Sequence, residues 1–222
     1  MPRKKEPERV DINRERIIKT AKEQFFKNGV ENTKIDTVAK QAGMSKSTLY
    51  VYFKSKEEIV DCISLEAMRY LLEQLQKNVP CVNQGNGITF HEQYMAICHV
   101  LAAFKHNYPL NFQLLIQEIK VDEESLERNP VLKEIYDCGE QINQYVIRIL
   151  MGTQKAESRE RMTAKIFAQW GSIYGLILLA DNKEQYIMKN MHMTKEAFLE
   201  QGFEQLYRTM NWEELRCWPH QY

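Results

Sequence analysis

The chain has 222 residues, of which 44% are hydrophobic and 27% are charged, so it is long enough for one large or two modest globular domains. Its 30 Lys and Arg balance 30 Asp and Glu, and a net charge of zero by itself argues against a nucleic-acid partner. The balance conceals an asymmetry. Residues 1–56 hold 14 Lys and Arg against 7 Asp and Glu, a net charge of +7, which leaves −7 for residues 57–222. A basic N-terminal module on an acidic body is expected if only one end of the molecule meets DNA.

The N-terminal segment predicts a charged arm followed by one helix. Residues 1–12 are expected to be a flexible basic arm, and they lack the apolar core of a secretory signal. The helix is expected at about residues 13–28, with Gly29 as its C-cap. Its predicted buried stripe consists of Ile17, Ile18, Ala21, Phe25 and Phe26. We expect this helix to brace the following segment rather than to read DNA.

Residues 33–56, TKIDTVAKQAGMSKSTLYVYFKSK, predict two short helices around a glycine. Thr33 is expected to cap the first helix, with Asp36 as its reciprocal partner in a capping box. Gly43 ends this helix, because a glycine enters a left-handed turn without steric cost. The second helix is expected at about residues 45–53. Two helices separated by a turn glycine at this spacing are typical of a helix-turn-helix.

The second helix of this pair has the polar leading end that a recognition helix needs. Base reading in a major groove is assigned to Lys46, Ser47 and Thr48, because an ammonium group donates to guanine and small hydroxyls reach several base edges. Contacts to backbone phosphates are expected from the surrounding hydroxyl and ammonium groups of Thr33, Ser45, Tyr50, Tyr52, Lys54 and Lys56. The alternative, that the aromatic residues are core, is accepted for Phe53 and in part for the rings of the two tyrosines.

Residues 21–59, AKEQFFKNGVENTKIDTVAKQAGMSKSTLYVYFKSKEEI, resemble the signature of the TetR family of bacterial transcriptional regulators. The resemblance covers under a quarter of the chain. It implies an all-α fold in which residues 13–56 form a three-helix DNA-binding domain with the helix-turn-helix. Residues 57–222 would then form a larger, divergent helical domain for ligand binding and dimerisation.

Caps and apolar periodicity predict further helices after this region. Ser55 and Glu58 form a capping box that opens a long helix to about Lys77. The later elements are expected to be a loop at 78–89, helices at about 90–107 and 109–119, an acidic loop at 121–129, and a helix at about 130–150 capped by Asn129. The resemblance implies that the long helix is a lever. A ligand that shifted its far end would spoil the docking of a dimer on half-sites about 34 Å apart.

Residues 158–180 form the most apolar segment of the chain, but its continuous apolar part is too short for a membrane span. Small residues lie on one side of it, and a companion helix is expected at about 194–210. The resemblance implies a four-helix dimer interface built from these two helices, with Ala168, Gly171, Gly175, Phe198, Phe203 and Leu206 as candidate contacts. The alternative is an ordinary buried core helix.

The body is rich in large aromatic side chains with polar groups among them, a combination that suits an apolar or amphipathic small molecule. The candidate pocket residues are Tyr94, Phe104, Tyr108, Phe112, Gln113, Gln117, Tyr145, Phe167, Trp170 and Tyr174. Aromatic residues at helical spacing are also typical of a plain core, which is the alternative for each of them.

Catalytic and metal-binding motifs are not found in the sequence. It contains no GxSxG, HExxH or phosphate-binding glycine loop, and its five scattered cysteines lack a CxxC pair. We therefore expect no cofactor, no metal and no enzymatic activity, and reduced thiols, with redox sensing by one cysteine left as an alternative.

These patterns together predict a cytoplasmic, homodimeric regulator that binds a palindromic operator in double-stranded DNA and does not bind a membrane. The most favoured version is a repressor released by a small-molecule effector. The alternatives are a ligand-independent DNA-binding factor, or a protein-interaction or enzymatic body with a DNA-anchoring head.

Overall fold

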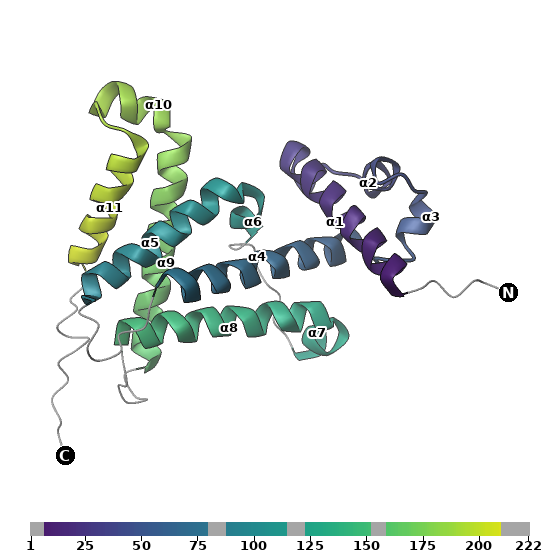
Figure 1. Ribbon diagram of the computed structural model, residues 1–222, viewed down its shortest axis with the longest axis horizontal. Helices are drawn as coiled ribbons and strands as arrows, with labels where there is room; N and C mark the ends of the chain where they lie inside the picture. The colour runs from purple at the N-terminus through teal and green to yellow at the C-terminus, as the bar shows by residue number, and fades with distance from the viewer. Residues whose placement is uncertain (1–6, 80–87, 115–122, 152–158, 210–222) are drawn as a thin grey trace, which may run out of the picture. The chain divides into compact units, whose positions relative to one another are not determined.

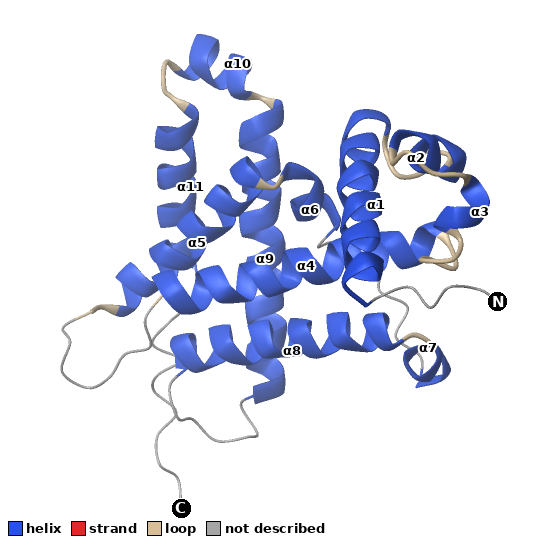
Figure 2. Ribbon diagram, turned by 45° about the vertical axis from the view of Figure 1, so that its right-hand side comes forward, coloured by secondary structure: helices blue, strands red, loops and turns tan. Residues whose placement is uncertain are grey.

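The computed structural model describes residues 7–79, 88–114, 123–151 and 159–209, and these form helices and loops without a strand (Figures 1 and 2). The elements are α1 (Pro7–Asn28), α2 (Ile35–Gln41), α3 (Lys46–Leu49), α4 (Lys56–Asn78), α5 (Phe90–Asn107), α6 (Pro109–Leu114), α7 (Glu123–Arg128), α8 (Pro130–Met151), α9 (Arg159–Asn182), α10 (Glu184–Tyr186), the π-helix η2 (Ile187–Met191) and α11 (Lys195–Thr209). The predicted all-α fold is confirmed. Among the described helices, none is both long and apolar enough to span a membrane.

The chain divides into two compact units. The N-terminal unit comprises residues 1–70 and 108–138, and the C-terminal unit comprises residues 71–107 and 139–222. The N-terminal unit therefore holds more than the helix-turn-helix, since it also includes α6, α7 and the beginnings of α4 and α8. The division into a DNA-binding domain at 13–56 and a body at 57–222 stays a prediction.

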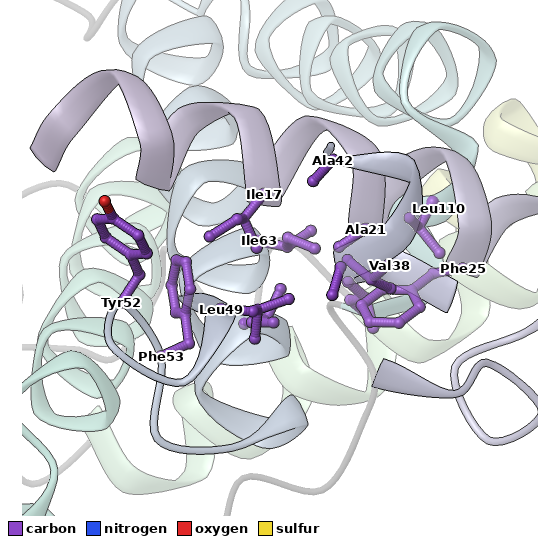
Figure 3. Close-up of a cluster of buried hydrophobic side chains, with 13 residues drawn as sticks. Ile17, Ala21, Phe25, Val38, Ala42, Leu49, Tyr52, Phe53, Ile63 and Leu110 are labelled. Carbon is purple, nitrogen blue, oxygen red and sulfur yellow. The ribbon is translucent and has the colours of Figure 1, made fainter. Parts of the chain in front are cut away.

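The core of the N-terminal unit is built from α1, α2, α3, α4 and α6 together with the turn after α3 (Figure 3). Its fully or nearly fully buried side chains include Ile17, Ala21, Phe25, Val38, Ala39, Leu49, Phe53, Ile59 and Ile63. Leu110 and Leu114 of α6 belong to the same cluster. The resemblance implies that this segment belongs to the body, so the participation of α6 in the core of the helix-turn-helix is a finding of the structure.

Helix α1 begins earlier and buries a narrower stripe than expected. It starts at Pro7, so residues 7–12 are helical and the predicted arm over 1–12 is wrong for them. Proline is favoured in the first turn of a helix because its fixed φ suits the helix and its missing N–H is not needed there. Phe26 is exposed, whereas Phe25 is buried. Gly29 closes the helix with a φ of +79°, as predicted.

Helix α2 is not capped by Thr33. Its N-cap is Lys34, which makes no side-chain capping bond. Thr33 is only 4% exposed, and its hydroxyl donates to the carbonyl oxygens of Gly29 at 2.7 Å and Gln24 at 3.2 Å. This hydroxyl fastens the loop after α1 to the end of that helix, so the predicted capping box with Asp36 is wrong.

Gly43 makes the turn between α2 and α3, as predicted, with a φ of +71°. A Cβ added there would have no heavy atom within 4 Å, so a substitution meets backbone strain rather than a clash.

Gly43→Ala is expected to lower the free energy of unfolding by about 1–2 kcal/mol, the cost of a left-handed conformation. Gly43→Asn should cost less, because asparagine tolerates this region better. Urea unfolding measures both, and equal costs for the two variants would contradict the strain argument.

Helix α3 ends at Leu49 instead of continuing to about Phe53. Residues 50–52 form a turn in which the amides of Tyr52 and Phe53 both donate to the carbonyl of Leu49, at 2.8 and 3.1 Å. Aromatic and β-branched residues such as Val51 favour a helix only weakly. The early stop lets Leu49 and Phe53 both enter the core.

The predicted caps of α4 and α8 are present. Ser55 Oγ accepts from the amide of Glu58 at 3.2 Å, although the Glu58 carboxylate accepts from the amide of Lys54 rather than from that of Ser55. Asn129 Oδ1 accepts from the first amides of α8 at 3.1 and 3.2 Å. The predicted acidic loop before it is wrong, since residues 123–128 form α7. Glutamate, leucine and arginine are good helix formers, which explains this element.

In the C-terminal unit, α5, α9 and α11 pack against one another. Ile166, Ile173 and Ile177 give α9 a buried face. Helix α11 approaches this helix closely at Gly202, where an added Cβ would lie 2.4 Å from Leu176 Cδ2. The ring centroids of Tyr207 in α11 and Tyr94 in α5 lie 5.3 Å apart, so α11 also packs against α5.

Candidate nucleic-acid interface

The leading end of α3 carries a network of hydroxyl groups. Ser45 is its N-cap and accepts from the amide of Thr48 at 3.1 Å. The same oxygen lies 2.8 Å from the hydroxyls of both Ser47 and Thr48. Ser45 and Ser47 are exposed, and Thr48 is half-buried. The three side chains therefore form one pre-ordered polar surface.

Lys46 projects from the same end of α3 and pairs with Asp36 of α2. Its Nζ lies 2.7 Å from Asp36 Oδ1, and the two side chains are 53% and 63% exposed. The hydrogen bond to the carboxylate, followed by the charge of that carboxylate, raises the pKa of Lys46 above its usual value. The ammonium group is therefore fully protonated at neutral pH and held at a defined place on the surface.

Two tyrosines follow α3, and they differ in exposure. Tyr50 is exposed. The ring of Tyr52 is buried, and its hydroxyl accepts from Asn13 Nδ2 of α1 at 2.8 Å. Arg14 donates to the Tyr52 carbonyl and stacks over the ring of Phe53, with 4.1 Å from its Cζ to the ring centroid. Helix α1 thus braces the end of the helix-turn-helix, and Tyr52 acts as part of the core.

The two lysines at the start of α4, Lys54 just before it and Lys56 as its first residue, also differ. Lys54 is exposed, whereas Lys56 is half-buried and donates from Nζ to the carbonyl of Val30 at 3.0 Å. Lys56 thereby ties the loop after α1 to the start of α4, which makes it a poor candidate for a phosphate contact. Thr33 is buried with its hydroxyl engaged, so the prediction of a phosphate contact is wrong for it.

The structure thus brings together Lys46, Ser47 and Thr48 as predicted, with Ser45, Tyr50 and Lys54 accessible around them. The residue that the sequence analysis missed is Asp36, to which it gave a capping role. A partner ten positions away on another helix leaves no local signal in the sequence. The opposite charges at 36 and 46 become informative only once α2 and α3 cross.

The candidate interface residues of the C-terminal unit lie on two helices, α9 and α11, and differ in burial. Ala168, Gly171 and Gly175 are exposed on α9, and a Cβ added at either glycine would have no heavy atom within 4 Å. Phe198 and Leu206 of α11 are half-buried. Phe203 is fully buried within its own chain, so the prediction that it contacts a partner subunit is wrong.

The candidate pocket residues do not form one set. Phe167 is 68% exposed, and Tyr108 and Gln113 are also exposed, so the pocket prediction is wrong for them; Gln117 lies outside the described residues. Phe112 is buried and belongs to the N-terminal unit, whereas Phe104 and Tyr94 are buried in the C-terminal unit. Half-buried Tyr145 donates to the Val79 carbonyl at 2.8 Å, and Trp170 is half-buried as well.

One polar pair joins two helices inside the C-terminal unit. Tyr94 donates from its hydroxyl to Gln169 Oε1 at 3.1 Å, between α5 and α9. Burial raises the pKa of Tyr94 above its usual range and that of Tyr174, further along α9, to about 12. Both phenols are therefore neutral hydrogen-bonding groups at physiological pH.

Comparison with known proteins gives a family for the N-terminal region. Residues 17–63 match the family model described as bacterial regulatory proteins, tetR family. A relative, the fatty acid metabolism regulator protein of Bacillus subtilis, is 35% identical over 63 residues. That match covers 28% of this chain and 32% of the relative, so the chain spans about a third of the length of this curated protein.

Solved structures extend the likeness to the whole fold. The fatty acid degradation regulator FadR from Bacillus halodurans superposes with a TM-score of 0.59 at 15% identity, over 94% of this chain and 99% of that one. The MbdR regulator from Azoarcus sp. CIB gives a TM-score of 0.59 at 18% identity, over 89% and 98%. At such identities the likeness shows the fold alone. Residues 17–63 thus match the tetR family of bacterial regulatory proteins, and the fold is similar to that of solved regulators.

Proposed function

We propose that the protein is a homodimeric transcriptional regulator in the cytoplasm that binds a palindromic DNA operator through α3. The observation that carries the proposal is the exposed polar end of α3, where Lys46 and three hydroxyls stand together on a module of net charge +7. A recognition helix reads base edges with its N-terminal residues, and the surrounding positive charge supplies affinity for phosphates. The two Bacillus relatives named above are described as regulators of fatty acid metabolism or degradation.

A dimer is supported by the outward face of α9. Gly171 and Gly175 leave open space where side chains would stand, and exposed Phe167 and Leu179 lie on the same helix. An exposed face that combines small and large apolar residues lets a second copy approach closely and gives it apolar area to bury. A two-fold dimer binds two half-sites, which explains how so small a reading surface gains affinity.

We further propose that a small apolar or amphipathic effector releases the protein from DNA, which would make it a repressor. The Tyr94–Gln169 pair offers polar groups among aromatic residues inside the C-terminal unit. Helix α5, which carries Tyr94, is followed along the chain by α6, and α6 contributes Leu110 and Leu114 to the core of the helix-turn-helix. The proposal is that the effector acts through this covalent connection.

Paired lysine substitutions test the DNA-binding proposal. Lys46→Ala should lower the discrimination between operator and random DNA by about 1–3 kcal/mol, because a base contact is lost. Lys54→Ala should weaken binding to all sequences alike and reduce the salt slope by roughly one unit, because a phosphate contact is lost. Fluorescence anisotropy over a range of salt concentrations gives the dissociation constants of each variant for operator DNA and for random DNA. Identical behaviour of the two variants on specific and random DNA would contradict the assigned roles.

A further inference from the structure

The ion pair of Lys46 and Asp36 is the feature of the reading surface that the proposed function does not explain. It joins α2 to α3, with 2.7 Å between Nζ and Oδ1, and both side chains are more than half exposed. An exposed ion pair contributes little to stability, typically about 0–1 kcal/mol. A carboxylate at this place also repels DNA phosphates, which makes it a costly neighbour for a base-reading lysine. The position of the Asp36 carboxylate beside Lys46 is therefore better explained by a role in DNA binding than by stability.

The neighbouring polar groups are engaged with one another. Ser45 Oγ lies within 2.8 Å of the hydroxyls of Ser47 and Thr48, and it accepts the amide of Thr48. A hydroxyl donates or accepts as its rotor turns, so these three groups discriminate weakly between bases. The Lys46–Asp36 pair differs because its hydrogen-bond donor and acceptor cannot exchange roles. The ammonium only donates, and the carboxylate only accepts.

This fixed donor–acceptor pair matches the major-groove edge of one kind of base pair. In a G·C pair, guanine presents O6 and N7 as acceptors and cytosine presents its N4 amino group as a donor. The O6 and N4 atoms are themselves hydrogen-bonded at about 2.9 Å, close to the separation of Nζ and Oδ1 in the protein. We infer that Lys46 and Asp36 together read a single G·C base pair in each half-site, with Lys46 on guanine and Asp36 on cytosine N4.

The competing base pairs fit less well. A T·A pair in the same orientation offers thymine O4 to the lysine and adenine N6 to the carboxylate, but it lacks the second acceptor that guanine N7 supplies and adds a methyl group. The reversed pairs, C·G and A·T, set donor against donor and acceptor against acceptor. The expected order of preference is therefore G·C, then T·A, then the two reversed pairs. The carboxylate, which weakens binding to DNA in general, thereby acts as a specificity-determining group.

The inference rests on the proposed function, and Asp36→Asn tests it. An amide pairs well with adenine N6 and N7, so this variant should lose the preference for cytosine and shift toward T·A at the same base pair, by about tenfold in relative affinity. Lys46→Ala should relax the same base pair and no other. Glu31→Gln is the matched control, because Glu31 is exposed in the same unit and its substitution removes the same charge. The control should bind all DNA slightly more tightly with an unchanged base preference.

The experiment uses the purified full chain and its three variants in a selection from duplexes of random sequence, followed by binding to four operators that differ only at the selected base pair. A G·C preference in the parent protein that moves to T·A in Asp36→Asn supports the inference. Site selection by the parent protein with the same base preference in Asp36→Asn and Glu31→Gln would overturn the inference and leave the proposed function standing. Absence of any site selection by the parent protein would overturn both.

Discussion

Leu49→Ala is expected to lower the free energy of unfolding of the N-terminal unit by about 2–5 kcal/mol, the range for truncating a buried leucine. Leu49 is 0% exposed and is the buried anchor of α3, a helix of only four residues. So short a helix has almost no stability of its own, so its place depends on this contact with the core. We therefore expect site-specific DNA binding to disappear in the same variant.

Val51→Ala is the control, because Val51 is exposed in the turn that follows the same helix. Its effect on stability should stay within about 0.5 kcal/mol. Urea unfolding and operator binding measure the two variants side by side. Leu49→Ala with parental stability and parental DNA binding would show that α3 is not held as the structure describes.

Gly175→Leu is expected to separate the dimer and to lower operator affinity by about 100-fold or more, since two linked half-site contacts become independent ones. The isolated subunit should lose no stability. A Cβ added there meets no heavy atom within 4 Å in one chain, and leucine favours a helix more than glycine does, by roughly 0.8 kcal/mol. The substitution is therefore expected to act mainly at the proposed interface.

Gln144→Leu on α8 gives the matching control, because it adds the same side chain at another exposed helical position of the C-terminal unit. In this variant, the mass of the protein in solution measured by light scattering should remain that of a dimer. The operator affinity should also stay unchanged. A dimer that persists in Gly175→Leu with parental affinity would place the subunit contact on another surface.

Sequence patterns predicted the long helices well because each had a periodic apolar face and some also had a recognisable cap. The bounds of α5 agree with the expected range, and Asn129 and Ser55 make the capping bonds that their positions suggested. Periodicity shows which face of a helix is buried, but it does not show what covers that face. Phe203, which the resemblance implies is a contact to a partner subunit, is buried inside its own chain.

The proposed DNA-contacting surface was predictable only in part. The polar end of α3 followed from local residue types. The roles of Lys56 and Asp36 did not, because each side chain bonds to a group far away in the sequence, the Val30 carbonyl and the Lys46 ammonium. The contribution of Leu110 to the core was hidden in the same way, since α6 follows α5 in the chain but packs with the helix-turn-helix.

Binding of the purified protein to the DNA that flanks its own gene, against random DNA of equal length over a range of salt, tests the central claim most directly. The account predicts a dimer on a palindromic site, with affinity for that site about 1,000-fold or more above that for random DNA. Affinity for both DNAs should fall steeply with salt as phosphate contacts weaken. Weak binding that random DNA competes away equally would contradict the account and leave α3 without a reading function.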